Sequence, residues 1–278
     1  YVHALNRSSW IGGLICWVQT SPESPGLFLL FQSIFKHQSP QEFEQLAASL
    51  GFSEDEVKAT MIYIAAVYSD LYKSFGDSKF VPGVDEAKFS QLIEASKAYT
   101  AGEGVKDVWR KIKPCVFSLQ KRVLHLGLGE EGLTTYFSSN CCKSDAEAIQ
   151  KFLDKNNISA YNTRLFKETV DGKTVYIVRQ ASSAVSQADS KGDRQQPLEG
   201  SKDATVEVAK GDYAEIMAIL VEELGKTKET ALNDNEKNML KHYIESFANG
   251  SIEEHKTASR FWIKDKGPIV ENYIGFIE

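Results

Sequence analysis

The chain has 278 residues, of which 42% are hydrophobic and 25% charged, so it can bury one large core or two modest ones. It carries 32 Lys and Arg against 38 Asp and Glu, a net charge of -6 at pH 7, and no basic run, which argues against nucleic acid and anionic membranes as partners. The longest apolar stretch near the start, WIGGLICWV at residues 10–18, is far shorter than the ~20 residues of a membrane span, and it predicts a buried helix or core segment.

Residues 1–119 are predicted to form a helical subregion. Ser39 is a typical N-cap because the capping-box acid Glu42 follows three residues later, and Ser53 with Glu56 repeats the pattern at the start of a second helix. Two further helices are predicted from their apolar spacing, at residues 85–98 and 105–119, the second with Pro114 as its kink or end. We expect these helices to pack as a bundle-like layer.

Glycine-rich sequence follows in HLGLGEEGLTTYFSSN, which predicts a short strand near residues 134–137. Gly127, Gly129 and Gly132 match the GxGxxG spacing of dinucleotide-binding loops. We reject a nucleotide site, because two glutamates lie where phosphate would bind and the required strand-and-helix context is missing.

Residues 120–278 are predicted to be a mixed α/β subregion. The expected elements are a helix at 144–155, a hairpin of 160–168 and 174–179, a strand at 204–208, and helices at 213–230 and around 239–247. Asp171 and Gly172 form the hairpin turn, and Asp212 is expected to cap the helix after it. Residues 182–202, without a large aromatic residue, predict a mobile surface loop.

The cysteines show no disulfide-framework spacing, which favours reduced thiols and a cytoplasmic location. They are Cys16, Cys115, Cys141 and Cys142. The vicinal pair at 141 and 142 has no third ligand nearby in the sequence, so we interpret it as structural and not as a metal site.

The C-terminal stretch FWIKDKGPIVENYIGFIE sets acidic groups and a tyrosine in an aromatic, strand-forming setting. Gly267 and Pro268 end any preceding helix, and the apolar residues after them favour an extended chain. Glu271 and Tyr273 are two residues apart, so on a strand they share one face. A carboxylate beside a phenol can hold a cationic amine and donate a hydrogen bond to a carbonyl oxygen.

Long sequence motifs extend over most of the chain, with 82–113 and 182–202 as the divergent tracts. They are WIGGL, QTSPESP, YKSFGDSKFVP, HLGLGEEGLTTYFS, DKNNISAYNTRLFKE, KGDYAEI, ESFANGSIEEHK, SRFWI and DKGPIVENYIGFIE. In order and approximate spacing they resemble the N-terminal half of the dipeptidyl peptidase III family of zinc-dependent exopeptidases. We therefore predict an α+β fold, with a helix-rich N-terminal layer and a mixed segment with short strands. The resemblance implies that residues 1–278 form most of the lower, peptide-binding lobe of a two-lobed peptidase.

The two zinc-binding motifs of that family, HExxGH and EECRAE, are absent from this sequence. The five histidines never stand four or five residues apart, the spacing that puts two imidazoles of one helix on one metal ion. Glu254 and His255 have no second histidine after them, and we interpret both as surface residues of an amphipathic helix. The resemblance thus implies zinc in the complete protein and none bound by this chain.

The resemblance implies functional roles for three residues. Phe75 matches a phenylalanine that lines the peptide-binding cleft, although by itself it indicates a core aromatic at a helix exit. Glu271 matches a glutamate that binds the free amino terminus of the peptide, although alone it would be a solvent-facing strand residue. Tyr273 matches a tyrosine that points at the scissile carbonyl, although alone it would be a half-buried strand tyrosine. Asn272 stands where family members often have serine, and it would face the other side of the strand.

The resemblance implies that the complete protein removes dipeptides from the N-terminus of short peptides by means of a zinc-activated water. Its partners would be short peptides and the missing zinc-binding lobe. Tyr1 at the start and the apolar pattern running to Glu278 favour a fragment, with a targeting segment before Tyr1 left open. We expect the chain alone to be inactive. The alternative is a non-catalytic truncated isoform or paralogue that binds peptides or a protein partner.

Overall fold

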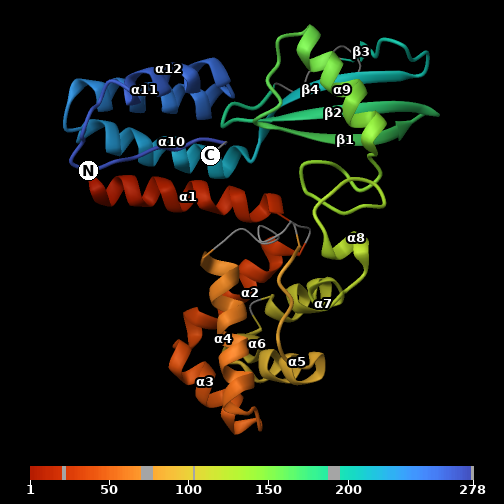
Figure 1. The fold of residues 1–278 in the computed structure, drawn as a ribbon, viewed down its shortest axis with the longest axis vertical. Helices are drawn as coiled ribbons and strands as arrows, with labels where there is room; N and C mark the ends of the chain where they lie inside the picture. Colours follow the sequence, from red (N-terminus) through yellow and green to blue (C-terminus); the bar gives the residue numbers. More distant parts are fainter. Residues whose placement is uncertain (21–22, 70–77, 103, 187–194, 277–278) are drawn as a thin grey trace. The chain divides into compact units, whose positions relative to one another are not determined.

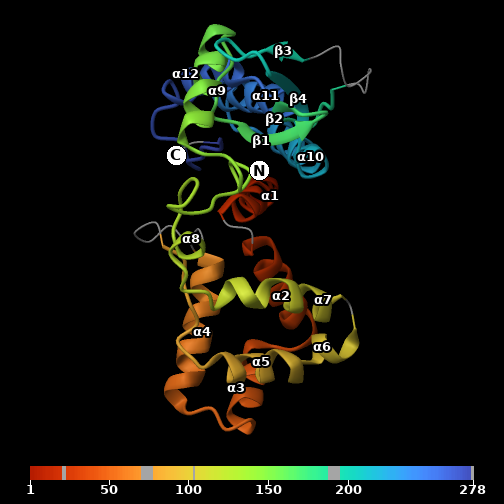
Figure 2. The same ribbon diagram turned by 90° about the vertical axis from the view of Figure 1, so that its right-hand side faces the viewer.

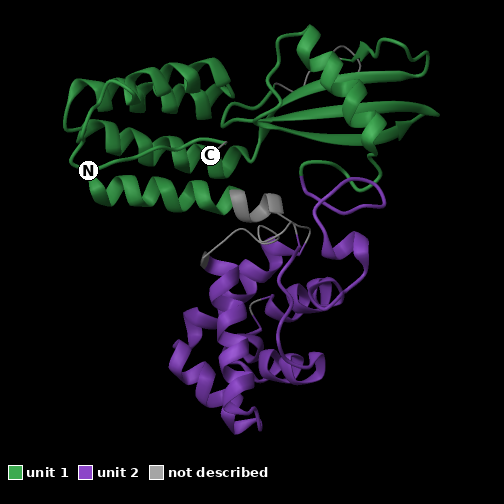
Figure 3. Ribbon diagram, viewed as in Figure 1, with its two compact units in different colours: residues 1–15, 136–278 green, residues 16–135 purple. Residues whose placement is uncertain are grey.

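A computed structural model describes residues 1–20, 23–69, 78–102, 104–186 and 195–276, and for 16–20 and 69 it describes the backbone alone (Figure 1). The chain divides into two compact units, which Figure 3 colours separately. Unit 1 consists of residues 1–15 and 136–278, and unit 2 of residues 16–135. The sequence predicted subregions 1–119 and 120–278 within one lobe of the complete protein, and this division stays a prediction. Helices together with a small mixed sheet confirm the predicted α+β class.

Unit 2 is helical over the residues that the structure describes. Its helices are α2 (Ser24–His37), α3 (Pro40–Ser49), α4 (Glu54–Ser69), α5 (Glu86–Ala95), α6 (Lys97–Ala101), α7 (Val105–Val116) and α8 (Lys121–Leu124). The capping box that starts α3 is confirmed, because the Ser39 amide donates to Glu42 Oε2 at 2.7 Å and the Glu42 amide donates to Ser39 Oγ at 3.2 Å. The predicted helix 85–98 is wrong in its extent, since α5 ends at Ala95 and Ser96 caps α6 separately.

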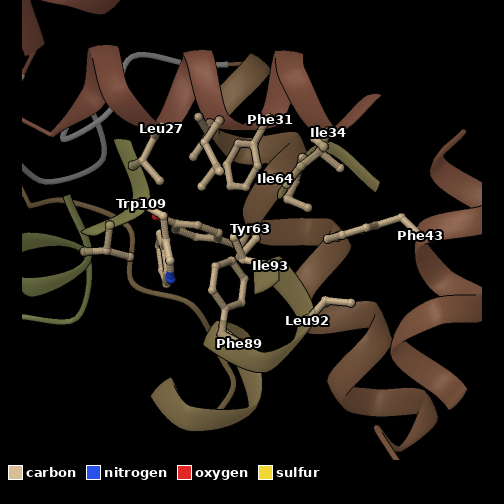
Figure 4. Packing of buried hydrophobic residues seen from close by; sticks show 14 of the residues in the cluster. Leu27, Phe31, Ile34, Phe43, Tyr63, Ile64, Phe89, Leu92, Ile93 and Trp109 are labelled. Carbon is tan, nitrogen blue, oxygen red and sulfur yellow. The ribbon is translucent and has the colours of Figure 1, made fainter. Parts of the chain in front are cut away.

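Aromatic side chains from four helices form the centre of the unit 2 core (Figure 4). The ring of Tyr63 on α4 meets Phe31 of α2 at 6.2 Å and Phe89 of α5 at 5.9 Å, both edge to face. Trp109 of α7 lies 5.9 Å from Phe89 between ring centroids. Such edge-to-face pairs add to the stabilisation that comes from burial of apolar area.

A four-stranded sheet lies at one end of unit 1. Its strands are β1 (Thr163–Val170), β2 (Lys173–Ala181), β3 (Gln196–Pro197) and β4 (Ala204–Asp212), in the order β1-β2-β4-β3. The β1–β2 hairpin is confirmed, with Asp171 and Gly172 both at positive φ as its turn requires. Helix α9 (Lys143–Lys155) packs on one face of the sheet (Figure 2).

Two predictions about the strands need correction or restriction. The strand expected near 134–137 is only a single bridge between Phe137 and Leu165. In the predicted loop 182–202, β3 pairs with β4, while residues 187–194 lie outside the described part of the chain. Sequence periodicity is weak for a strand as short as β3, because two residues are too few to show alternation.

Beside the sheet and α9, the described residues of unit 1 include four helices. They are α1 (Val2–Thr20), which unit 1 shares up to residue 15, α10 (Ala214–Glu229), α11 (Asp234–Asn249) and α12 (Ile252–Trp262). Their apolar faces meet in one core around Tyr243, which is fully buried. In the parts of the chain that the structure describes, no helix is long and apolar enough to span a membrane.

The predicted cap of α10 is wrong. Tyr213, at φ 55°, is the N-cap and makes no side-chain capping bond. Asp212 instead accepts two hydrogen bonds from Arg164, from Nε and Nη2 at 2.7 Å each. A bidentate guanidinium pair satisfies both carboxylate oxygens at once, whereas a cap would satisfy one.

Candidate functional site

Residues 263–276, the C-terminal segment, cross unit 1 without forming a strand. Phe276 packs on Phe247 of α11, with ring centroids 5.4 Å apart, and Ile274 lies beside Gly12 of α1. The predicted strand is therefore wrong. An extended chain becomes a strand only where another strand can pair with it, and this segment lies against helices.

Helix α12 brings two aromatic side chains to this segment. His255 and Trp262 are seven residues apart, so two helical turns place them on the same face. The helix starts at the cap Ser251, whose Oγ accepts a hydrogen bond from the Glu254 amide at 3.3 Å. His255 is half-buried and Trp262 is exposed by 38%.

The hydroxyl of Tyr273 lies 2.9 Å from Nε2 of His255. The Tyr273 ring also packs in T-shaped contacts on Trp262 and on Tyr243, with centroids 5.5 Å and 6.3 Å apart. Three aromatic neighbours therefore fix the phenol, although 44% of the residue stays exposed. A tyrosine held in this way is oriented in advance and can still reach a ligand from solvent.

The carboxylate of Glu271 is held by the same tryptophan. Trp262 Nε1 donates to Glu271 Oε1 at 2.6 Å. The indole occupies one carboxylate oxygen and so orients the group, and because Glu271 is exposed, its second oxygen can still accept a hydrogen bond from a cation. Glu271 and Tyr273 thus lie on the same side of the segment, as their spacing predicts, and both meet Trp262.

Asn272, between them, points to the other side. Its Nδ2 donates to the hydroxyl of Tyr1 at 2.8 Å. Burial, and then the carboxylates of Glu236, Asp265 and Glu271, raise the pKa of Tyr1 to about 12. The N-terminal residue is therefore a neutral phenol that ties the segment to the start of α1.

A cavity of about 740 Å³ opens beside Tyr273. Its walls come from α12, the C-terminal segment and the loop before β1. It is lined by Tyr161, Ile252, His255, Lys256, Ser259, Arg260, Trp262, Ile263, Tyr273 and Phe276. Aromatic and apolar walls with a few polar groups are typical of ligand sites. Glu271 is not among the residues that line this cavity.

The interpretation as surface residues holds for Glu254, whose side chain is 38% exposed, but needs correction for His255, which is half-buried. Glu254 Oε2 lies 2.5 Å from Nδ1 of His242 on α11, and the His242 ring stacks on Phe261 at 5.5 Å. His255 stacks on Tyr243 at 5.7 Å. The sequence shows α12 as amphipathic, but not that His255 packs against Tyr243 of α11 and Tyr273 of the C-terminal segment.

Zinc, which the resemblance implies for the complete protein, does not fit the described residues. Within those ranges, no group of three or more His, Cys, Asp and Glu side chains could hold a metal ion. Cys141 is buried and Cys142 exposed at the start of α9, where the Cys142 amide donates to Asp145 Oδ2 at 2.8 Å. No chemical step is therefore assigned to a metal in this chain.

Phe75, predicted to line the cleft, lies outside the described residues. The residues that sequence reasoning missed are His255 and Trp262. A signal for them exists in the sequence, since a histidine and a tryptophan seven positions apart on a helix precede the acidic and aromatic segment. Without the structure, nothing says that this face turns toward Glu271 and Tyr273.

Known proteins similar to this chain are peptidases. The sequence model of peptidase family M49 matches residues 108–278. The chain is 47% identical over 284 residues to dipeptidyl peptidase 3 of Homo sapiens, and 44% identical over 290 residues to that of Nematostella vectensis. It is 36% identical over 280 residues to dipeptidyl peptidase 3 of Dictyostelium discoideum. All three matches cover 100% of this chain but only 38%, 40% and 38% of the relatives, so the chain spans about two fifths of their length.

Proposed function

This chain belongs to peptidase family M49, and we propose that it is the peptide-binding part of a dipeptidyl peptidase that releases dipeptides from the N-terminus of short peptides. The observation that carries the proposal is that Trp262 contacts both residues: its indole N–H orients the Glu271 carboxylate, and its ring packs on Tyr273. Zinc in the remaining part of the complete protein would supply the activated water. The other partner would be that zinc-binding lobe, and the location would be the cytoplasm.

Glu271 is proposed to bind the ammonium group of the substrate. A single fixed carboxylate selects a free amino terminus, because a charge-assisted hydrogen bond to an ammonium is stronger than one to a neutral amide. The Trp262 indole leaves the second carboxylate oxygen for this purpose. Recognition of the free terminus would make the enzyme an exopeptidase.

Tyr273 is proposed to donate a hydrogen bond to the oxygen of the scissile carbonyl. Such a donor is worth most when charge builds up on that oxygen in the transition state, so it affects kcat more than substrate binding. The ring contacts with Trp262 and Tyr243 fix the phenol before the substrate arrives.

Two substitutions in the complete protein test these roles. Glu271→Gln should raise KM for a dipeptidyl arylamide roughly 10- to 100-fold, because a charged hydrogen bond is lost. Tyr273→Phe should lower kcat roughly 10- to 100-fold and change KM little. Wild-type kinetics in both variants would refute the site assignment.

The 278 residues alone are expected to show no peptidase activity. Purified chain is incubated with the dipeptidyl arylamide in the presence and absence of a chelator. Hydrolysis that the chelator abolishes would show that this chain holds its own metal centre, contrary to the proposal.

A further inference from the structure

The hydroxyl of Tyr273 is held by a ring that the proposed function leaves without a role, His255. We propose that His255 is a positioning residue that, as the Nε2–H tautomer, donates to the Tyr273 oxygen and leaves the phenolic proton free for the substrate carbonyl. This inference rests on the role proposed for Tyr273. It adds a residue, a hydrogen-bond direction and a tautomer.

The imidazole is held on three sides. Tyr243 of α11 stacks on it with centroids 5.7 Å apart and planes 29° apart, and the Tyr273 ring meets it at 80°. Gly275 closes the third side, since a Cβ there would lie 2.5 Å from Cε1 of His255. A larger residue at position 275 would press on the imidazole, so these three contacts together limit the orientations of the ring.

The imidazole is neutral near pH 7, because burial lowers the pKa of His255. A neutral imidazole has one donor and one acceptor nitrogen, so the 2.9 Å bond can run in either direction.

The direction of this bond decides what Tyr273 can do. If Nδ1 carries the proton, Nε2 accepts the phenolic hydrogen, and the hydroxyl has no proton left for a ligand. If Nε2 carries it, the imidazole donates to the phenol oxygen and the phenolic hydrogen points elsewhere. Donation to that oxygen also polarises the O–H bond, because successive hydrogen bonds strengthen one another. Only this second arrangement permits Tyr273 to stabilise a developing oxyanion.

Kinetics of the complete protein test the role. His255→Phe keeps an aromatic ring and removes the nitrogen, so kcat should fall roughly 2- to 10-fold, the worth of one hydrogen bond, with KM nearly constant. His255→Gln places an amide N–H near the position of Nε2 and should recover most of the loss. His242→Gln is the matched control, since His242 also stacks on an aromatic ring and bonds across α11 and α12, but to Glu254. It should leave kcat unchanged.

A double variant shows whether His255 acts through Tyr273. In a Tyr273→Phe background, His255→Phe should cause no further loss of kcat. If the two residues acted independently, their fold-losses in kcat would multiply. A full second loss would overturn the inference. If Tyr273→Phe lowers kcat and His255→Phe does not, this inference fails alone. If Tyr273→Phe leaves kcat unchanged, the proposed function fails first.

Ring nitrogen NMR on the 278-residue chain tests the tautomer without any activity. The ¹⁵N shifts of His255 should show a protonated Nε2 at pH 7, and Tyr273→Phe should shift that signal while the His242 signals stay in place. A protonated Nδ1, or an Nε2 signal that ignores Tyr273→Phe, would overturn the inference. Gly275→Ala should move the same signal, because the added Cβ displaces the ring.

Discussion

Both units have apolar cores, but they differ in the charged groups that they bury. Unit 2 is built around apolar and aromatic side chains, and the buried pair of Lys79 with Glu23, 3.7 Å apart, is an exception within its described part. Unit 1 buries carboxylates that pair with cationic side chains, among them Asp145 with Lys167 and Asp212 with Arg164. Packing tolerates many arrangements of similar volume, whereas a buried charge needs its partners at set distances. The unit that carries the candidate site is thus the one that buries more carboxylates among the described residues.

The largest expected effect is on the stability of unit 2. Phe89 is fully buried and meets Tyr63, Trp109 and Phe117, so Phe89→Ala should lower the free energy of unfolding of unit 2 by about 3–5 kcal/mol. Hydrogen exchange across residues 16–135 measures it. Ile62→Ala, at a residue exposed by 58%, is the control and should cost about 0.5 kcal/mol or less. Equal effects of the two variants would show that unit 2 does not depend on its aromatic core.

A second prediction concerns pH and the buried carboxylate Asp145. Burial raises its pKa, but hydrogen bonds from Tyr176, the Cys142 amide and Lys167 outweigh burial and lower the pKa from 3.8 to about 2. The folded state then binds fewer protons than the unfolded state between these values. Stability from this group is complete above about pH 4 and is lost as pH falls toward 2, by about 2 kcal/mol.

Denaturant unfolding of wild type and Asp145→Asn from pH 2 to 6 isolates this carboxylate. The variant should be less stable above pH 4 and should approach the wild type at pH 2. Parallel curves over the whole range would mean that Asp145 is not a source of acid sensitivity.

The smallest expected effect is at the capping box of α3. Ser39→Ala removes the acceptor for the Glu42 amide and should cost about 1 kcal/mol, measured by chemical denaturation of unit 2. Ser49→Ala, in the same helix, removes a hydroxyl that donates to the Leu46 carbonyl at 2.7 Å and serves as control. A greater loss from Ser49→Ala would contradict the importance of the cap.

Local signals predicted local structure well. The capping box at Ser39 and the Asp171–Gly172 turn each depend on a few neighbouring residues, and both are present. Parallel pairing of β2 with β4 joins residues about thirty positions apart, as between Thr174 and Ala204, and no local pattern specifies it. Asp212 was misjudged for the same reason, because its partner Arg164 is 48 positions away.

The candidate site shows the same limit. A spacing of two residues placed Glu271 and Tyr273 on one side, although the strand from which this was argued is absent from the described segment. Alternation of side chains belongs to any extended backbone, so it survives without a ladder. The support from His255 and Trp262 depends on how α12 packs, which is a tertiary property.

Unit 1 is discontinuous in the chain, and this affects the order in which the protein folds during synthesis. Asn272 bonds to Tyr1 and Ile274 packs by Gly12, so both ends of the sequence must exist before the unit is complete. At roughly 5–20 residues per second, the ribosome needs on the order of ten seconds to pass from the end of unit 2 to that segment. During this time unit 2 has all its residues, while the first helix waits with its apolar face uncovered. We expect this interval to be the point at which a chaperone is most useful to the nascent chain.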